Sequence, residues 1–128
     1  MSNEAIHTES APAAIGTYSQ AVKAGHTVFI SGQIPLDPTT MEVVTGNMET
    51  LIRQGFDNLS AVAQAASSSL DDVVKLTVFL TDLNQFALVN HVMADYFSLP
   101  YPARAVVEVA ALPKGVPVEI DAILHLDC

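Results

Sequence analysis

Apolar residues recur along this chain with two different periods, and each period predicts a different kind of element. Between residues 47 and about 69 they return every three or four positions, as on one face of a helix. Asn47 can cap this helix, and Glu49 lies in the first turn, where the helix dipole favours a carboxylate. The predicted apolar face consists of Leu51, Ile52, Phe56, Leu59, Val62, Ala63 and Ala66.

A second helix is predicted to follow Asp82, a possible capping residue, and to end before Pro100 and Pro102. Its inward positions are Phe86, Val89, Val92, Met93 and Phe97. Elsewhere, β-branched and aromatic residues in short runs are typical of strands. We expect strands at residues 26–34, 71–82, about 104–111 and about 116–126, with Val74, Leu76, Val78 and Leu80 on one side of the 71–82 strand. Residues 1–20 are expected to be irregular, and residues 35–47 to turn around a short hairpin-like segment.

The order of these elements predicts an α+β fold in which two helices cover one face of a mixed sheet. The length of 128 residues fits a single domain, 1–128. In the last strand Val116, Val118, Ile120, Ala122, Leu124 and Leu126 share one side, and Ile123 lies on the other. A sheet that is apolar on both sides, with helices for only one, suggests that the second face packs against other subunits.

Charge and composition argue against several functions. The formal net charge is −9, and the five Lys and Arg residues are scattered, whereas phosphate backbones and anionic membranes are bound by clustered cations. We therefore expect no nucleic-acid or membrane partner.

The single cysteine, Cys128, is the last residue, and neither it nor the four histidines show metal-ligand spacing, so no metal site is expected. The polar N-terminus lacks the features of a signal peptide, and no apolar run approaches the ~20 residues of a membrane span, so the cytoplasm is the expected location.

Arg104 lies in the otherwise apolar run YPARAVVEV, residues 101–109. In a strand its side chain shares one face with Val106, Glu108 and Ala110. It could reach solvent at a strand start or pair with Glu108. Alternatively, its planar guanidinium could bind a carboxylate through two parallel hydrogen bonds. Composition alone leaves both interpretations open.

Glu119 is the second candidate, in the middle of the last predicted strand on the same face as Asp121 and His125. Such a face is usually solvated, which is our interpretation for Asp121 and His125. In a closed cleft, burial would raise the pKa of Glu119 and suit it to proton transfer. Tyr18 and Ser31 form a third pair, although a lid on the core and a strand-end hydrogen bond would explain them equally well.

Four stretches together resemble the RidA (YjgF) family of reactive-intermediate deaminases: APAAIGTYSQA, ISGQIPLDP, VVKLTVFLTDLNQFALVN and YPARAVVEVAALPKGVPVEI. The last is similar to the family signature of Pro-Ala-Arg, an apolar strand, a turn and apolar-Glu-Ile. The resemblance runs from about Ala11 to Leu126. It implies a chorismate-mutase-like fold that assembles as a homotrimer, with a central barrel and clefts between neighbouring subunits.

The resemblance also implies residue roles and a reaction. Arg104 matches the arginine that binds the substrate carboxylate, and Glu119 matches the acidic residue that handles water. The catalytic tyrosine and serine and the residues that line or support the cleft are matched by Tyr18, Ser31, Gly32 and Asn90. The implied reaction hydrolyses 2-imino acids, tautomers of 2-enamino acids such as 2-aminoacrylate, to 2-keto acids and ammonia, without cofactor or metal.

The sequence departs from the family pattern at three places. Val106 stands where many members carry cysteine, so that only its backbone could contact substrate. Ser67 stands where a glycine is common at the helix end, which costs a little stability. The segment FSLPYPAR is short compared with that of some members, and this affects the rim of the cleft.

Other functions are compatible with the resemblance. One is a non-catalytic trimer that binds or senses 2-keto acids; the presence of both Arg104 and Glu119 favours the enzyme, because a pure binder needs the arginine more than the acid. RNA cleavage is disfavoured by the net charge of −9. A chaperone role would rest on exposed apolar surface, which assembly into a trimer would bury.

Overall fold

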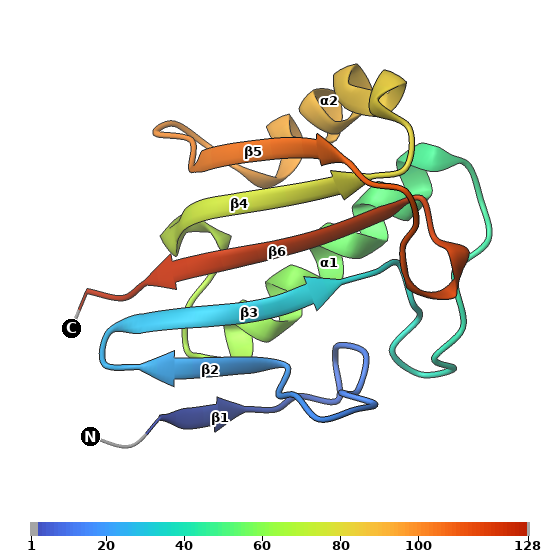
Figure 1. Cartoon of the computed structure of the whole chain (residues 1–128). Coiled ribbons are helices and arrows are strands. Elements are labelled where there is room, and N and C mark those ends of the chain that lie inside the picture. Colours follow the sequence, from blue (N-terminus) through green and yellow to red (C-terminus); the bar gives the residue numbers. More distant parts are fainter. Residues whose placement is uncertain (1–2, 128) are drawn as a thin grey trace.

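The computed structural model describes residues 3–127 and has a six-stranded sheet with two helices packed on one face (Figure 1). In spatial order the strands are β1 (Glu4–Ile6), β2 (Ala21–Ala24), β3 (Thr27–Gln33), β6 (Val118–His125), β4 (Val73–Leu80) and β5 (Ala103–Glu108). The β4–β5 pair is parallel and the other neighbours are antiparallel, so the sheet is mixed. The predicted α+β architecture is confirmed.

Helix α1 (Met48–Ala65) begins as its sequence predicts. The side chain of Asn47 accepts a hydrogen bond from the backbone N–H of Thr50 at 3.0 Å, which satisfies one of the free donors of the first turn. The helix lies across β3 and β6 and buries Phe56 completely. Gly55 permits this close packing, because a Cβ there would lie 3.0 Å from Cδ1 of Ile120. The helix ends before residue 69, since Ser67 adopts a left-handed conformation with φ 62°.

Helix α2 (Phe86–Tyr96) follows a 3₁₀ turn, η2 (Leu83–Gln85). Asp82 caps this turn by accepting the N–H of Asn84, so the expected cap acts one element earlier than predicted. Val89, Val92, Met93 and Phe97 are buried as expected. The inward prediction for Phe86 was wrong: its side chain is 40% exposed and packs on the guanidinium of Arg104 instead of the core.

The N-terminal part of the sheet was not predicted. Residues 4–6 form β1 rather than irregular chain, and β2 pairs between β1 and β3. Both strands are short, so neither shows a clear alternation. The turn from β2 to β3 uses Gly25, whose φ of 63° is accessible to glycine at little cost. The hairpin-like segment expected after β3 is confirmed by a bridge between Leu36 and Val43.

The alternation predicted for β4 is broken at its start. Leu76, Val78 and Leu80 are completely buried, but Val74 is half exposed and Val73 is buried in its place. The cause is an irregularity in the pairing with β6 between Val73 and Lys75, which shifts the side chains by one position. A β-bulge of this kind leaves no signal in the hydrophobic pattern.

The two faces of the sheet differ in what covers them. On the helix side, Val118, Ile120, Ala122 and Leu124 of β6 are buried, as predicted. On the other face, Phe29 is 49% exposed and pairs across the strands with Ile123, and Val107 is also exposed. Within residues 3–127 no helix packs on this face, which we call the open face (Figure 1). No helix in the described range is long and apolar enough to cross a membrane.

Candidate active site

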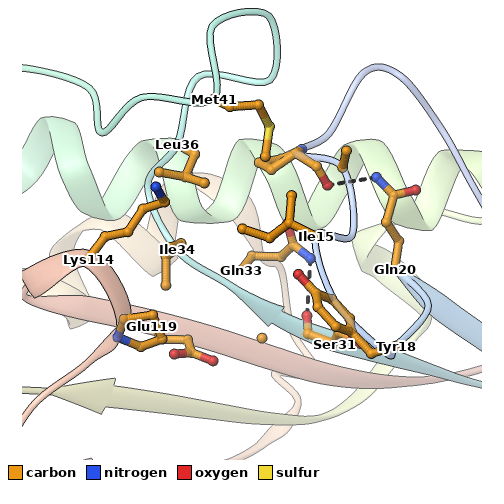
Figure 2. Close-up of a pocket in the computed structure, with 14 residues that line it drawn as sticks. Ile15, Tyr18, Gln20, Ser31, Gln33, Ile34, Leu36, Met41, Lys114 and Glu119 are labelled. Atoms are coloured by element: carbon orange, nitrogen blue, oxygen red, sulfur yellow. Dashed lines mark hydrogen bonds between the residues drawn. The ribbon is translucent and has the colours of Figure 1, made fainter.

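A cavity of about 500 Å³ lies beside the end of β3 and the start of β6 (Figure 2). Three irregular segments complete its wall: residues 12–18, residues 34–41, and the 3₁₀ turn η3 (Pro113–Gly115). It contains four of the residues singled out from the sequence, namely Tyr18, Ser31, Gly32 and Glu119. We call it the Glu119 cavity.

Glu119 projects from the open face and lies against the backbone of β3. A Cβ at Gly32 would collide with its carboxyl group, approaching Cδ to 2.8 Å, so the glycine provides the space that the carboxylate occupies. Burial raises the pKa of Glu119 above its ordinary value, and the nearby Asp121 carboxylate adds to the rise. A carboxylate with a raised pKa beside an open space can exchange a proton with a small molecule.

Tyr18 and Ser31 are held in place by backbone contacts. The Ser31 hydroxyl donates to the carbonyl of Ser19 at 2.6 Å, and the Ser31 N–H donates to the carbonyl of Gln20 at 3.0 Å. These bonds attach the segment that carries Tyr18 to β3. The Ser31 oxygen keeps acceptor capacity, while its proton is already engaged. The half-exposed Tyr18 side chain faces the same space as Glu119 (Figure 2).

Gln20 fixes the remainder of the N-terminal segment. Its side chain is buried and donates to the carbonyls of Thr8, Ala11 and Pro12 while accepting the N–H of Thr8 at 2.7 Å. An amide that bonds three carbonyls stabilises an irregular chain that lacks a sheet partner of its own. The N-terminal part of the cavity wall is therefore held in place by hydrogen bonds although it is irregular chain.

Arg104 lines a second cavity, of about 470 Å³, with Asn90, Met93 and Tyr101. Its Nη1 donates to Oδ1 of Asn90 and contacts Sδ of Met93 at 3.4 Å. The guanidinium carbon lies 5.1 Å from the centroid of the Phe86 ring, a cation–π contact. Helix α2 thus holds one corner of the guanidinium. Among the described residues, Nε and Nη2 have no partner, which leaves an edge suited to a carboxylate.

The expected alternative partner of Arg104 is engaged elsewhere. Glu108 accepts a hydrogen bond from the N–H of Leu83 at 2.8 Å and forms no ion pair with Arg104. Val106 follows Arg104 on the same face and packs at the margin of the core. Val106 is not one of the described residues that line the two cavities.

The side chains of Arg104 and Glu119 point to opposite faces of the sheet. Arg104 pairs with Leu76 in the β4–β5 ladder, and Leu76 is buried under the helices. Glu119 pairs with Phe79, three positions further along β4, and residues an odd number apart in a strand point to opposite faces. Within one chain, Arg104 and Glu119 therefore do not contact the same ligand molecule.

The sequence did not indicate several residues of the Glu119 cavity. Lys114, Ile15 and Met41 all line it, and they come from turns and loops without periodicity. The one available signal was the turn LPKG, which precedes β6 and must therefore lie near Glu119. No group of three potential metal-ligating side chains was found in residues 3–127; Cys128 lies outside the described residues.

Comparison with known proteins identifies the family of this chain. Residues 8–126 match the family model described as Endoribonuclease L-PSP, which represents the YjgF/RidA proteins. The chain belongs to the RidA family. A RutC family protein of Pyrococcus horikoshii is 52% identical over 95% of this chain and 97% of its own length. The 2-iminobutanoate/2-iminopropanoate deaminase of Mus musculus is 48% identical over 92% of this chain and 87% of its own length.

The fold is likewise that of solved RidA proteins. The crystal structure of RidA from the Antarctic bacterium Psychrobacter superposes with a TM-score of 0.92 at 55% identity, covering 96% of this chain and 99% of its own. The family resemblance read from the sequence is therefore confirmed, and so is the fold class.

Proposed function

We propose that this RidA protein hydrolyses 2-imino acids, the tautomers of 2-enamino acids, to 2-keto acids and ammonia. The observation that carries the proposal is the Glu119 carboxylate. It lines a cavity, occupies the space left by Gly32 and has a raised pKa. The deaminase name of the mouse relative supports the same reaction. The cytoplasm, expected from the sequence, stays the predicted location.

The chemistry requires little machinery. Water adds to the electrophilic imine carbon, the Glu119 carboxylate takes a proton from that water, and the imine nitrogen gains a proton. The resulting carbinolamine then expels ammonia and leaves the keto group. Positioning of water and proton transfer are therefore the main tasks, and we assign them to Glu119 and Tyr18, with Ser31 as an acceptor. That the three residues line one cavity supports this assignment.

Arg104 is proposed to fix the substrate carboxylate. The corner of its guanidinium that contacts Asn90 and Met93 is held by α2, and the free edge can form two parallel hydrogen bonds. The local charge of this group outweighs the acidic net charge of the protein at the distance of a bound anion. Gly32 and Asn90 then serve as supporting residues, and the backbone near Val106 extends the same face.

The positions of Arg104 and Glu119 on opposite faces lead to a proposal about assembly. If both groups act on one substrate molecule, they come from different copies of the chain. The open face, with Phe29, Val107 and Ile123, supplies apolar surface for such packing. We propose a homotrimer with clefts between subunits, the assembly implied by the resemblance to the family.

A scavenging assay tests the proposed activity. An amino-acid oxidase generates 2-imino acids in situ, semicarbazide traps them, and the protein is added at substoichiometric concentration. We expect wild type to suppress semicarbazone formation and Arg104→Ala not to do so. If a folded wild-type protein fails to suppress it, the chain is a carboxylate binder without chemistry, which is the alternative function.

RNA cleavage, suggested by the description of the family model, receives less support. A phosphate backbone is bound by several cations in a row. Here Arg53 is paired with Glu49 and Asp95, and Lys114 is the one cation among the described residues of the Glu119 cavity.

A further inference from the structure

A methionine sulfur lies directly against the guanidinium of Arg104. Met93, in α2, accepts a hydrogen bond through its Sδ from Nη1 of Arg104 at 3.4 Å, and the same nitrogen donates to Asn90. The side chain of Met93 is largely buried, but it belongs to the wall of the cavity of about 470 Å³ that Arg104 lines, which we call the Arg104 cavity. A small molecule in this cavity therefore meets the thioether and the cation together.

A thioether in this position is a target for oxidation by a peroxide. Sulfur is polarizable and has two lone pairs, of which the contact with Arg104 uses one. The other attacks an oxygen of the peroxide: an S–O bond forms, the O–O bond breaks, and sulfur supplies the two electrons. With hydrogen peroxide, the released hydroxide takes the proton of the transferred oxygen, which gives methionine sulfoxide and water. A free N–H of Arg104 stabilises the negative charge that develops on the leaving oxygen.

Oxidation of Met93 changes what Arg104 can bind. A sulfoxide oxygen is a much stronger hydrogen-bond acceptor than a thioether, and the sulfur already lies within hydrogen-bond distance of the guanidinium. The new oxygen therefore competes with a carboxylate for the N–H groups of Arg104, and it occupies space in the Arg104 cavity. Hydrogen bonds to a charged donor are the strong ones, so the competition acts on the interaction that holds the substrate.

Two other methionines occur within residues 3–127, and both lie away from this cation. Met41 is in a loop and lines the Glu119 cavity, and Met48 begins α1 and packs against the core. Neither belongs to the described wall of the Arg104 cavity. The same chemical change at Met48 would leave Arg104 untouched, which makes this residue a matched control.

We propose that Met93 is a redox-sensitive site, at which reversible oxidation by a peroxide blocks the free edge of Arg104 and lowers the activity of the protein. The proposal rests on the proposed function, because it takes Arg104 as the group that binds the substrate carboxylate. One hydrogen bond to a charged group is worth about tenfold or more in an equilibrium constant. We therefore expect the sulfoxide to weaken binding of 2-oxobutanoate, and to lower kcat/KM, by about tenfold or more. A methionine sulfoxide reductase should restore both.

The test uses a parent protein with Met41→Leu and Cys128→Ser, in which neither the thioether of the Glu119 cavity nor the thiol reacts. The parent is treated with hydrogen peroxide, and peptide mapping by mass spectrometry follows each remaining methionine. Calorimetry with 2-oxobutanoate and semicarbazone suppression should both show losses that grow with the fraction of Met93 sulfoxide. Adding Met93→Leu keeps a similar volume without sulfur, so treated and untreated samples should agree. Adding Met48→Leu instead should leave the sensitivity of the parent unchanged.

A parent protein that keeps its affinity for 2-oxobutanoate after Met93 is oxidised would overturn the proposal. So would an equal loss in the Met93→Leu variant, or a Met93 that stays reduced while Met48 is oxidised. If no imine is deaminated, the proposed function fails, and the affinity for 2-oxobutanoate before and after treatment still decides about Met93. A parent that binds no 2-oxobutanoate before treatment contradicts the role of Arg104 and overturns this proposal with it.

Discussion

At the scale of single residues, contacts with helix α2 fix the orientation of the Arg104 side chain. One nitrogen is committed to Asn90 and Met93, and the guanidinium carbon lies over the ring of Phe86. These contacts on α2 fix the orientation of the side chain in the absence of a carboxylate. A group that is oriented in advance loses less freedom when its ligand binds, which strengthens both affinity and positioning.

This arrangement predicts that charge alone cannot replace the arginine. A lysine at position 104 keeps the positive charge but lacks the planar pair of donors and the stacking face. We expect Arg104→Lys to lose nearly as much activity as Arg104→Ala, about 30-fold or more in kcat/KM, or about 2 kcal/mol. Steady-state kinetics of the two purified variants measure this, and near-normal activity of Arg104→Lys would exclude the bidentate role.

The environment of Glu119 predicts a pH dependence. Burial and Asp121 raise the pKa of its carboxyl, and only the ionised form can accept a proton from water. Activity should therefore fall as the pH drops through the raised pKa. In Asp121→Asn the repelling charge is gone, the pKa of Glu119 falls, and the acid limb of the kcat profile should move to lower pH.

The control for this shift is Asp71→Asn, which removes the same charge from an exposed position next to the start of β4. Its profile should coincide with that of wild type. An acid limb of Asp121→Asn that stays in place, or moves to higher pH, would contradict a coupling between the two carboxyls.

At the scale of elements, the residue that ends α1 has an unfavourable backbone conformation. Ser67 has a φ of 62°, a conformation in which a Cβ is strained and which glycine adopts freely. The backbone bonds that close the helix, from the N–H groups of Ser67 and Ser68 to carbonyls of the last turn, require this conformation. The family pattern of glycine at this position therefore has a physical reason.

We expect Ser67→Gly to raise the free energy of unfolding by about 0.5–1 kcal/mol. Thermal unfolding at fixed protein concentration measures the change. The same substitution within the helix, Ser60→Gly, should lower the stability because it adds backbone freedom where φ is already helical. A destabilised Ser67→Gly variant would show that the serine side chain contributes more than its strained backbone costs.

The elements that sequence predicted well are those with long patterns. Helix α1 and strand β6 each bury one periodic face, so their existence and orientation follow from the positions of their apolar residues. Strands β1 and β2 span three and four residues and carry no such pattern. The β-bulge that exposes Val74 depends on how β4 pairs with β6, which neither segment shows by itself.

The candidate site was also predicted only in part from the sequence. The resemblance to the family identified six residues, and the structure brings four of them into one cavity and two into the other: Tyr18, Ser31, Gly32 and Glu119, and Arg104 and Asn90. Alternation alone could place Arg104 on one face of its strand. It could not show that Phe86 turns toward the guanidinium, or that Met41 and Lys114 join the wall opposite Glu119, because their positions depend on the paths of loops.

At the scale of the whole molecule, the sheet separates the two groups that the proposed reaction needs together. Arg104 lies on the helix side, and Glu119 lies on the open face. The same open face carries exposed Phe29 and Val107, which are unfavourable in water. Packing of this face against another copy would bury the apolar surface and could also complete the site, which is the central claim of this account.

Complementation between two inactive variants tests that claim most directly. Arg104→Ala and Glu119→Gln chains are mixed in equal amounts, unfolded, refolded together and assayed by semicarbazone suppression. If each cleft takes Arg104 from one chain and Glu119 from another, half of the clefts receive an intact arginine and half of those an intact glutamate. We therefore predict that about one quarter of wild-type activity returns. Activity that stays at the level of the separate variants, from mixed oligomers that have formed, would contradict a site shared between subunits.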